Sequence, residues 1–303
     1  MEQKAIRGHI ALFAANILFG LNNPIARSLV PDVVSPYFLT FCRLTGGMVL
    51  FWLTSFFLPK EKVAKQDIFL LFFAAIFALS SNQLPFIIGL SKTSSIDASI
   101  VVTMLPILSM ILSFFILREP ISTKKVVGVF IGAMGAVILI VSSLHTASGT
   151  SNMWGNLIIF GAAISFALYI TVFKNLISRY SPITVMKWMF LFASIQCYPF
   201  FHLDLQTVSI HLFDVSTILR IGYVVVLATF VTYILLATGQ KALRPTTLSM
   251  YNYLQPIVAS LAAVAMGIDT LGMHQLISAG CVFFGVYLVT QSKSRAQVEK
   301  NLT

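Results

Sequence analysis

Long apolar segments without Asp, Glu, Lys or Arg dominate this chain and restrict what it can fold into. A helix needs about 20 apolar residues to cross the roughly 30 Å hydrocarbon core of a bilayer. Uninterrupted segments of that length are 8–26, 68–91, 98–117, 221–240, 245–268 and 270–292. A longer run, 126–173, divides at the turn-forming HTASGTSN of 145–152, and segments 36–58 and 183–203 carry one basic residue each, Arg43 and Lys187. We therefore predict an all-α integral membrane protein with ten transmembrane helices.

The composition excludes a water-soluble fold. Charged residues make up 10% of the chain and hydrophobic residues 57%, whereas a soluble domain carries about 25% charged residues. The net charge of +10 does not indicate nucleic-acid binding, because the basic residues are dispersed in small groups between apolar runs. Cys42, Cys197 and Cys281 lie inside apolar segments and are expected to be buried thiols, with no disulfide and no metal site.

The distribution of lysine and arginine predicts the orientation. With the N-terminus inside, the cytoplasmic segments hold most of the Lys and Arg residues, and the opposite face holds only Arg27, Lys92 and Arg220. Short cytoplasmic loops are enriched in Lys and Arg. We expect a multi-pass protein of the cell inner (plasma) membrane with both termini in the cytoplasm.

The chain contains an internal repeat. A shift of 150 residues aligns Gly89 with Gly239 and Pro106 with Pro256, and lays SSIDASIVVTMLPI over RPTTLSMYNYLQPI without a gap. The predicted units are 8–144 and 154–292, each with five helices, followed by a cytoplasmic tail, 293–303. Because five is odd, the second unit must enter the membrane from the opposite side, and such inverted repeats are typical of transporters.

Short motifs point to a family. FGLNNP in the first helix, SPYFLTFCRL at the start of the second and LREPIS after the fourth resemble the drug/metabolite transporter superfamily, in particular its EamA-domain group. The resemblance spans about residues 8–292, with two departures: Phe19 replaces the usual Trp, and Asp269 the usual Glu. It implies a permease for amino acids or other small metabolites, often an exporter, whose pathway lies among the first, third and fourth helices of each unit.

Polar side chains within the spans are the candidate substrate-binding residues, because hydrocarbon cannot satisfy them. The candidates are Asn16, Phe19, Asn23, Asn82, Gln83, Thr103, Tyr169, Tyr233, Tyr251, Asn252 and Gln255, and Asn22 and Phe86 lie close to them in the sequence. The alternative is that these groups only join neighbouring helices, at roughly 0.6 kcal/mol each.

Prolines and one arginine complete the candidates. Pro24, Pro85, Pro106 and Pro256 interrupt the helical hydrogen-bond ladder and are either static kinks or gating points. Arg43 lies seven residues into its helix, where it either extends to the membrane surface or contacts a substrate carboxylate.

Three classes of function remain for such a chain: an alternating-access permease, a passive facilitator or channel, and an intramembrane enzyme. The repeat disfavours the enzyme, and the chain has no phosphate-binding G-x-x-x-x-G-K-[ST] loop, G-x-S-x-G or H-E-x-x-H motif. We expect no cofactor and no metal. Without a Lys or Arg at mid-depth of the cavity, a sugar phosphate is disfavoured. The expected substrate is a small neutral or zwitterionic metabolite, such as an amino acid with an apolar side chain, that is exported.

The helices predicted at 126–144 and 270–292 are assigned to packing outside the pathway. The first carries Gly128 and Gly132, a G-x-x-x-G pair that favours close helix contact. This contact is either between the two helices or with a second subunit, so that both a monomer and a homodimer remain open. The other expected partners are the small-molecule substrate and the lipid bilayer.

Overall fold

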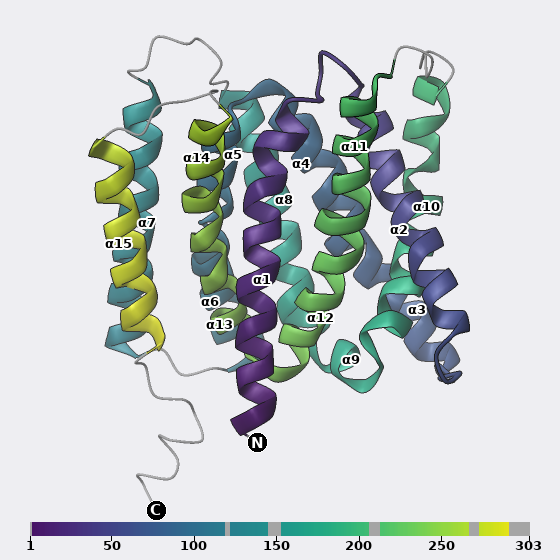
Figure 1. Ribbon diagram of the computed structural model, residues 1–303. Helices are drawn as coiled ribbons and strands as arrows, with labels where there is room; N and C mark the ends of the chain where they lie inside the picture. The colour runs from purple at the N-terminus through teal and green to yellow at the C-terminus, as the bar shows by residue number, and fades with distance from the viewer. Residues whose placement is uncertain (1, 119–121, 145–152, 206–212, 267–272, 291–303) are drawn as a thin grey trace, which may run out of the picture.

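The computed structural model describes residues 2–118, 122–144, 153–205, 213–266 and 273–290. Within these ranges the protein is all-α, and its helices stand roughly side by side in a single bundle (Figure 1). Residues 119–121 of the LREPIS turn, the divide at 145–152, Asp269 and the predicted tail 293–303 lie outside the described residues.

The helices follow the predicted apolar segments. The first half contains α1 (Glu2–Arg27), α2 (Pro36–Phe56), α3 (Lys65–Ala75), the π-helix η1 (Ile76–Ser80), α4 (Ser81–Lys92), α5 (Ser95–Val102), α6 (Leu105–Leu117) and α7 (Thr123–Leu144). The second half contains α8 (Met153–Val172), the short α9 (Lys174–Arg179), α10 (Pro182–Leu205), α11 (Val215–Gly222), the π-helix η3 (Tyr223–Val231), α12 (Thr232–Ala242), α13 (Pro245–Met250), the 3₁₀ turn η4 (Tyr251–Tyr253), α14 (Leu254–Ala265) and α15 (Met273–Thr290).

Five continuous helical stretches of the described chain are long and apolar enough to cross a membrane. They are Ala5–Arg27, Pro36–Phe56, Lys65–Lys92, Met153–Val172 and Val215–Ala242. The outer surface carries large apolar side chains, among them Phe57 at 88% exposed and Phe115 at 73%. Such a surface suits lipid rather than water, which supports a membrane location. The count of ten spans remains a prediction.

Serine and proline start two of the long helices in the same way. Ser35 precedes α2, and its hydroxyl accepts a hydrogen bond from the amide of Phe38 at 3.0 Å. Ser181 precedes α10 and accepts from the amide of Thr184 at 3.2 Å. In both cases proline is the first helical residue, where its missing N–H costs nothing. The two helices pack against each other.

Two further pairs of segments share an interruption. Lys65–Lys92 and Val215–Ala242 each contain a π-helical stretch, η1 in the first and η3 in the second. The segment Ser95–Leu117 is broken between α5 and α6, and Pro245–Ala265 changes to a 3₁₀ turn at η4. The two π-helical stretches lie inside longer helical segments, and such stretches are frequently found at functional sites.

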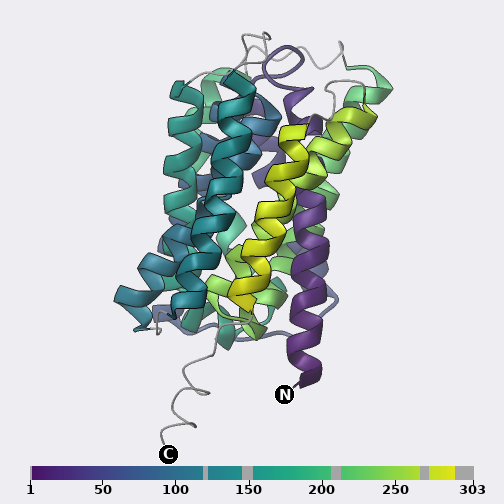
Figure 2. The same ribbon diagram turned by 90° about the vertical axis from the view of Figure 1, so that its left-hand side faces the viewer.

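The helices α7 and α15 form a separate pair at one edge of the bundle (Figures 1 and 2). A Cβ on Gly285 of α15 would lie 2.5 Å from the carbonyl oxygen of Gly128 and 2.8 Å from the amide nitrogen of Gly132. This contact explains the small residues of the G-x-x-x-G pair. Of the two alternatives for this contact, packing of the two helices on each other is therefore the one seen in the structure.

Candidate functional site

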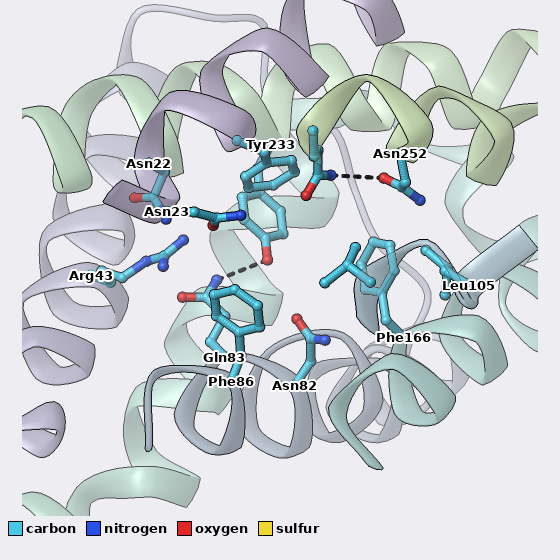
Figure 3. A pocket seen from close by; sticks show the side chains of 13 residues that line it. Asn22, Asn23, Arg43, Asn82, Gln83, Phe86, Leu105, Phe166, Tyr233 and Asn252 are labelled. Carbon is cyan, nitrogen blue, oxygen red and sulfur yellow. Dashed lines mark hydrogen bonds between the residues drawn. The ribbon is translucent and has the colours of Figure 1, made fainter. Parts of the chain in front are cut away.

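A cavity lies between the helices that carry the predicted polar residues (Figure 3). The volume of this cavity that is open to the centres of water-sized molecules is about 80 Å³. By the same measure a single water needs roughly 10–15 Å³. Its lining residues are Phe19, Asn22, Asn23, Arg43, Asn82, Gln83, Phe86, Val102, Leu105, Phe166, Tyr233, Asn252 and Gln255. They come from α1, α2, α4, α5, α6, α8, α12, η4 and α14, so that both halves of the chain contribute.

A chain of amides joins α1 to the α14 region beside the cavity. The side-chain nitrogen of Gln255 donates to Asn16 Oδ1 and to Asn252 Oδ1, both at 2.9 Å. Asn16 in turn donates to the carbonyl of Leu12 at 2.8 Å. All three amides are buried. Asn16 therefore holds the side chain of Gln255 by a hydrogen bond, and it is not itself one of the residues that line the cavity.

Other hydrogen bonds tie the lining residues across the bundle. Asn23 of α1 donates to the Ser99 hydroxyl at 2.7 Å, and Gln83 of α4 donates to the Tyr233 hydroxyl of α12 at 2.8 Å. Asn82 donates to the carbonyl of Ala162 at 2.9 Å. The Gln83–Tyr233 bond connects the first half of the chain to the second, and Figure 3 shows it inside the cavity.

Arg43 is buried within the bundle, so of its two alternatives the extension to the membrane surface does not fit the structure. Its side chain is 3% exposed and points into the cavity (Figure 3). Its Nε donates to the Thr229 hydroxyl at 3.2 Å, and that hydroxyl donates to the carbonyl of Val224 at 2.7 Å. Arg43 is among the lining residues, which agrees with the alternative that it contacts a substrate carboxylate, and its helix α2 packs against η3.

Besides Asn16, three predicted residues lie outside the lining. The Tyr169 hydroxyl donates to Gln240 Oε1 at 3.1 Å, and Tyr251 bonds to the His9 ring at 2.6 Å. Thr103 is fully buried at the break between α5 and α6. The first two sit among the apolar groups of a core cluster, where the helix-joining alternative describes them better than substrate contact.

The four predicted gating prolines lie within or at the start of helices near the cavity. Pro24 is inside α1 and Pro85 inside α4, whereas Pro106 and Pro256 fall within the first residues of α6 and α14. A proline has no N–H for the carbonyl four residues earlier. For Pro106 and Pro256 those carbonyls belong to Val102 and Asn252, and both residues line the cavity.

Five residues that line the cavity are not among those predicted from the sequence. Asn22 is a polar residue in a span and could have been included on that ground, and Phe86 lies one turn from Asn82. Val102, Leu105 and Phe166 are apolar residues in apolar helices and carry no signal in the sequence. In the described part of the chain, no three His, Cys, Asp or Glu side chains come together as a metal site would require.

Polar contacts also link the two halves at the end of the bundle where α1 begins. Asp67 at the start of α3 accepts hydrogen bonds from Arg179 at 3.1 Å and from the Tyr180 hydroxyl at 2.6 Å. The Asp67 carboxylate raises the pKa of Tyr180. Partial burial acts to raise the pKa of Glu61, but hydrogen bonds from Ser181 and Thr184 outweigh it, and the net effect is a lowered pKa.

Known proteins of similar sequence are transporters. An uncharacterized transporter of Archaeoglobus fulgidus is 27% identical over 233 residues, which are 77% of this chain and 81% of that protein. The uncharacterized transporter YetK of Bacillus subtilis (strain 168) is 23% identical over 302 residues, which are 97% of this chain and 90% of that protein.

The fold also matches a solved crystal structure of a protein, with a TM-score of 0.75 and 17% identity over 96% of this chain and 97% of that one. At that identity the likeness concerns the fold alone. Residues 6–141 and 153–291 each match the family model described as EamA-like transporter family. These two matches cover most of the chain, which therefore belongs to the EamA-like transporter family.

Proposed function

We propose that this protein is an alternating-access secondary transporter for a small neutral or zwitterionic metabolite, of the amino-acid exporter type. The observation that carries the proposal is the cavity itself. It lies within a bundle of apolar helices, and asparagine and glutamine side chains from both halves line it. Hydrocarbon cannot form hydrogen bonds with these side chains, so their proposed role is to bind a polar solute.

The proposal includes ten spans in two inverted units, 8–144 and 154–292. The two family matches support the division, and so do the paired interruptions at η1 and η3 and at the α5–α6 break and η4. The distribution of Lys and Arg supports an inner-membrane protein with both termini in the cytoplasm. It works in the bilayer as a monomer or homodimer.

The substrate is proposed to contact the lining amides and rings. Asn23, Asn82, Gln83, Tyr233 and Gln255 offer donors and acceptors, and Phe19 provides an apolar wall. Pro24, Pro85, Pro106 and Pro256 are proposed bending points, since each removes one hydrogen bond from its helix near this cavity.

A passive facilitator is the second candidate, but burial favours the carrier. Asn22 and Asn23 are 2% exposed, and Gln255 is 5% exposed. A channel requires a continuous polar path to both faces, whereas these side chains are closed off from the surface. A carrier passes through such an occluded state when its access changes from one face to the other.

Counterflow in proteoliposomes tests the proposal. Vesicles are preloaded with unlabelled substrate, diluted into a trace of labelled substrate, and followed in time, with a panel of amino acids as substrates. A carrier accumulates label transiently above its external concentration, because exit of unlabelled substrate returns the site for entry of label. Label that rises only to equilibrium supports the facilitator, and the absence of entry for the whole panel contradicts an amino-acid transporter.

A further inference from the structure

Arg43 is the one charged group among the residues that line the cavity. Its Nε is engaged by Thr229, a residue of the π-helix η3 whose hydroxyl is fixed on the Val224 carbonyl. The terminal nitrogens of the guanidinium face the cavity (Figure 3). A guanidinium held through Nε presents its two terminal nitrogens as a fork, and this fork matches the two oxygens of a carboxylate.

The described lining offers no carboxylate to this cation. Asp and Glu are absent from the residues that surround the cavity, and Asp97, which is also buried, is engaged with Thr93 instead. A buried charge without a counter-ion is strongly unfavourable. A carboxylate on a ligand would give this guanidinium the ion-pair partner that the described lining lacks.

Three buried polar atoms of the lining have no hydrogen-bond partner. They are Asn22 Oδ1, Gln83 Oε1 and Asn252 Nδ2. Their residues are 2%, 3% and 6% exposed, so that surface water does not account for them. Buried polar atoms nearly always have a partner, either protein or ordered water, and at the cavity wall a polar solute that displaces water can take this place. Two of these atoms are assigned as acceptors, and the cavity therefore offers acceptors for an N–H group beside the donors of Arg43.

We infer that the transported substrate carries a single carboxylate, which the terminal nitrogens of Arg43 bind, and that Asn22 and Gln83 accept hydrogen bonds from its amino group. The inference rests on the proposed transport function and selects an acid over a neutral metabolite. One guanidinium pairs with one carboxylate, whereas a phosphate monoester brings about two negative charges and would leave one without a cationic partner. The ammonium of an amino acid has no counter-ion in the described lining and is instead held by the acceptors Asn22 and Gln83. The apolar remainder of the substrate lies against Phe19, Phe86 and Phe166.

Thermal stabilisation of the purified protein in detergent tests this assignment without any transport step. The probes are leucine, 4-methylpentanoate, leucinamide, 4-methylpentanamide and 3-methylbutyl phosphate, which share a branched apolar group. We expect both carboxylates to stabilise the wild type at concentrations at least tenfold lower than the amides or the phosphate. We expect leucine to act at lower concentration than 4-methylpentanoate, because only leucine has the ammonium.

Arg43→Gln should remove the preference for acid over amide, and Arg220→Gln is the matched control. Arg220 bonds to the Ser28 and Ser216 hydroxyls outside the cavity, so its variant should keep the preference. Thr229→Val is a second test, because it frees Nε and should weaken the carboxylate response at least threefold. Without ligand, Arg43→Gln should melt no lower than the wild type, since it removes an unbalanced charge.

The assignment is overturned if no carboxylate stabilises the wild type, if acids and amides act alike, or if the preference survives Arg43→Gln. These outcomes differ from failure of the proposed function. Binding of leucine with no counterflow would contradict the transporter and leave the carboxylate site standing. Counterflow of leucinamide as fast as that of leucine would contradict the carboxylate site and support the transporter.

Discussion

Gly89 and Gly155 allow α4 and α8 to meet closely, and replacing Gly89 by alanine should force the two helices apart. A Cβ at Gly89 would lie 2.5 Å from Ile159 Cγ1 and 2.7 Å from the Gly155 carbonyl oxygen. The Ile159 side chain can rotate, but the carbonyl belongs to a helix backbone and cannot yield alone. The helix α4 carries Asn82, Gln83 and Phe86, so its displacement also changes the cavity.

The magnitude follows from two opposing terms. Overpacking costs about 1–3 kcal/mol, with the upper end expected where backbone must move. Alanine gains about 1 kcal/mol over glycine in helix propensity, which leaves a net loss of about 2 kcal/mol. Gly161→Ala in α8 is the matched control, because its Cβ would meet nothing within 4 Å and it makes the same gain in propensity. The two variants should therefore differ by about 3 kcal/mol.

Thermal melting in detergent measures this difference. At roughly 2 °C per kcal/mol for a large domain, Gly89→Ala should melt about 6 °C below Gly161→Ala, and its counterflow rate should fall. If Gly89→Ala melts at or above the temperature of Gly161→Ala, the close approach of α4 and α8 is not a feature of the folded protein.

The remaining predictions concern orientation, the amide chain and pH. In a variant without native cysteines, a cysteine at exposed Asp32 should react with an impermeant reagent added outside intact cells, and one at exposed Lys60 should not; the opposite pattern would reverse the topology. Gln255→Ala leaves the buried Asn16 oxygen without its donor, which should lower the free energy of unfolding by about 1–3 kcal/mol. Both this variant and Asn16→Ala should reduce amino-acid flux with protein levels unchanged. Undiminished flux would exclude the amide chain from transport. Because the pKa of Glu61 is lowered in the folded state, its stabilising effect is present above the ordinary pKa of 4.5 and is lost as the pH falls through the folded-state value. Glu61→Gln should therefore make the melting temperature depend less on pH between pH 6 and roughly pH 3. An unchanged dependence on pH would contradict this.

The sequence predicted the helices well because the bilayer imposes a simple rule on them. A run such as 68–91 must be helical and apolar to cross hydrocarbon, and Lys65–Lys92 is a continuous helical stretch. The π-helices η1 and η3 were not predictable, because they add one residue per turn without a distinctive composition. The position of Thr229, and through it that of Arg43, depends on this local change.

Site residues could be predicted from the sequence where a polar side chain in an apolar span lies at the cavity and is not satisfied elsewhere in the bundle. Asn23, Gln83 and Gln255 were identified because an amide in an apolar span needs partners, and all three line the cavity. Tyr169 and Tyr251 show the same signal, but Gln240 and His9 satisfy them elsewhere. The sequence cannot distinguish these cases, since the partner lies more than 70 residues away in each. The inward direction of Arg43 likewise depends on packing between helices.

Access to the cavity from each face tests alternating access most directly. Asn82 lines the cavity and is partly exposed, so Asn82→Cys in a variant without native cysteines places a single reactive thiol there. Right-side-out and inside-out vesicles are treated with an impermeant thiol reagent, with and without a saturating amino acid. We predict that the thiol reacts from both faces, because each molecule opens to one face and then to the other, and that bound substrate slows both reactions. Reaction from one face only, at every exposure time and with every solute, would contradict alternating access.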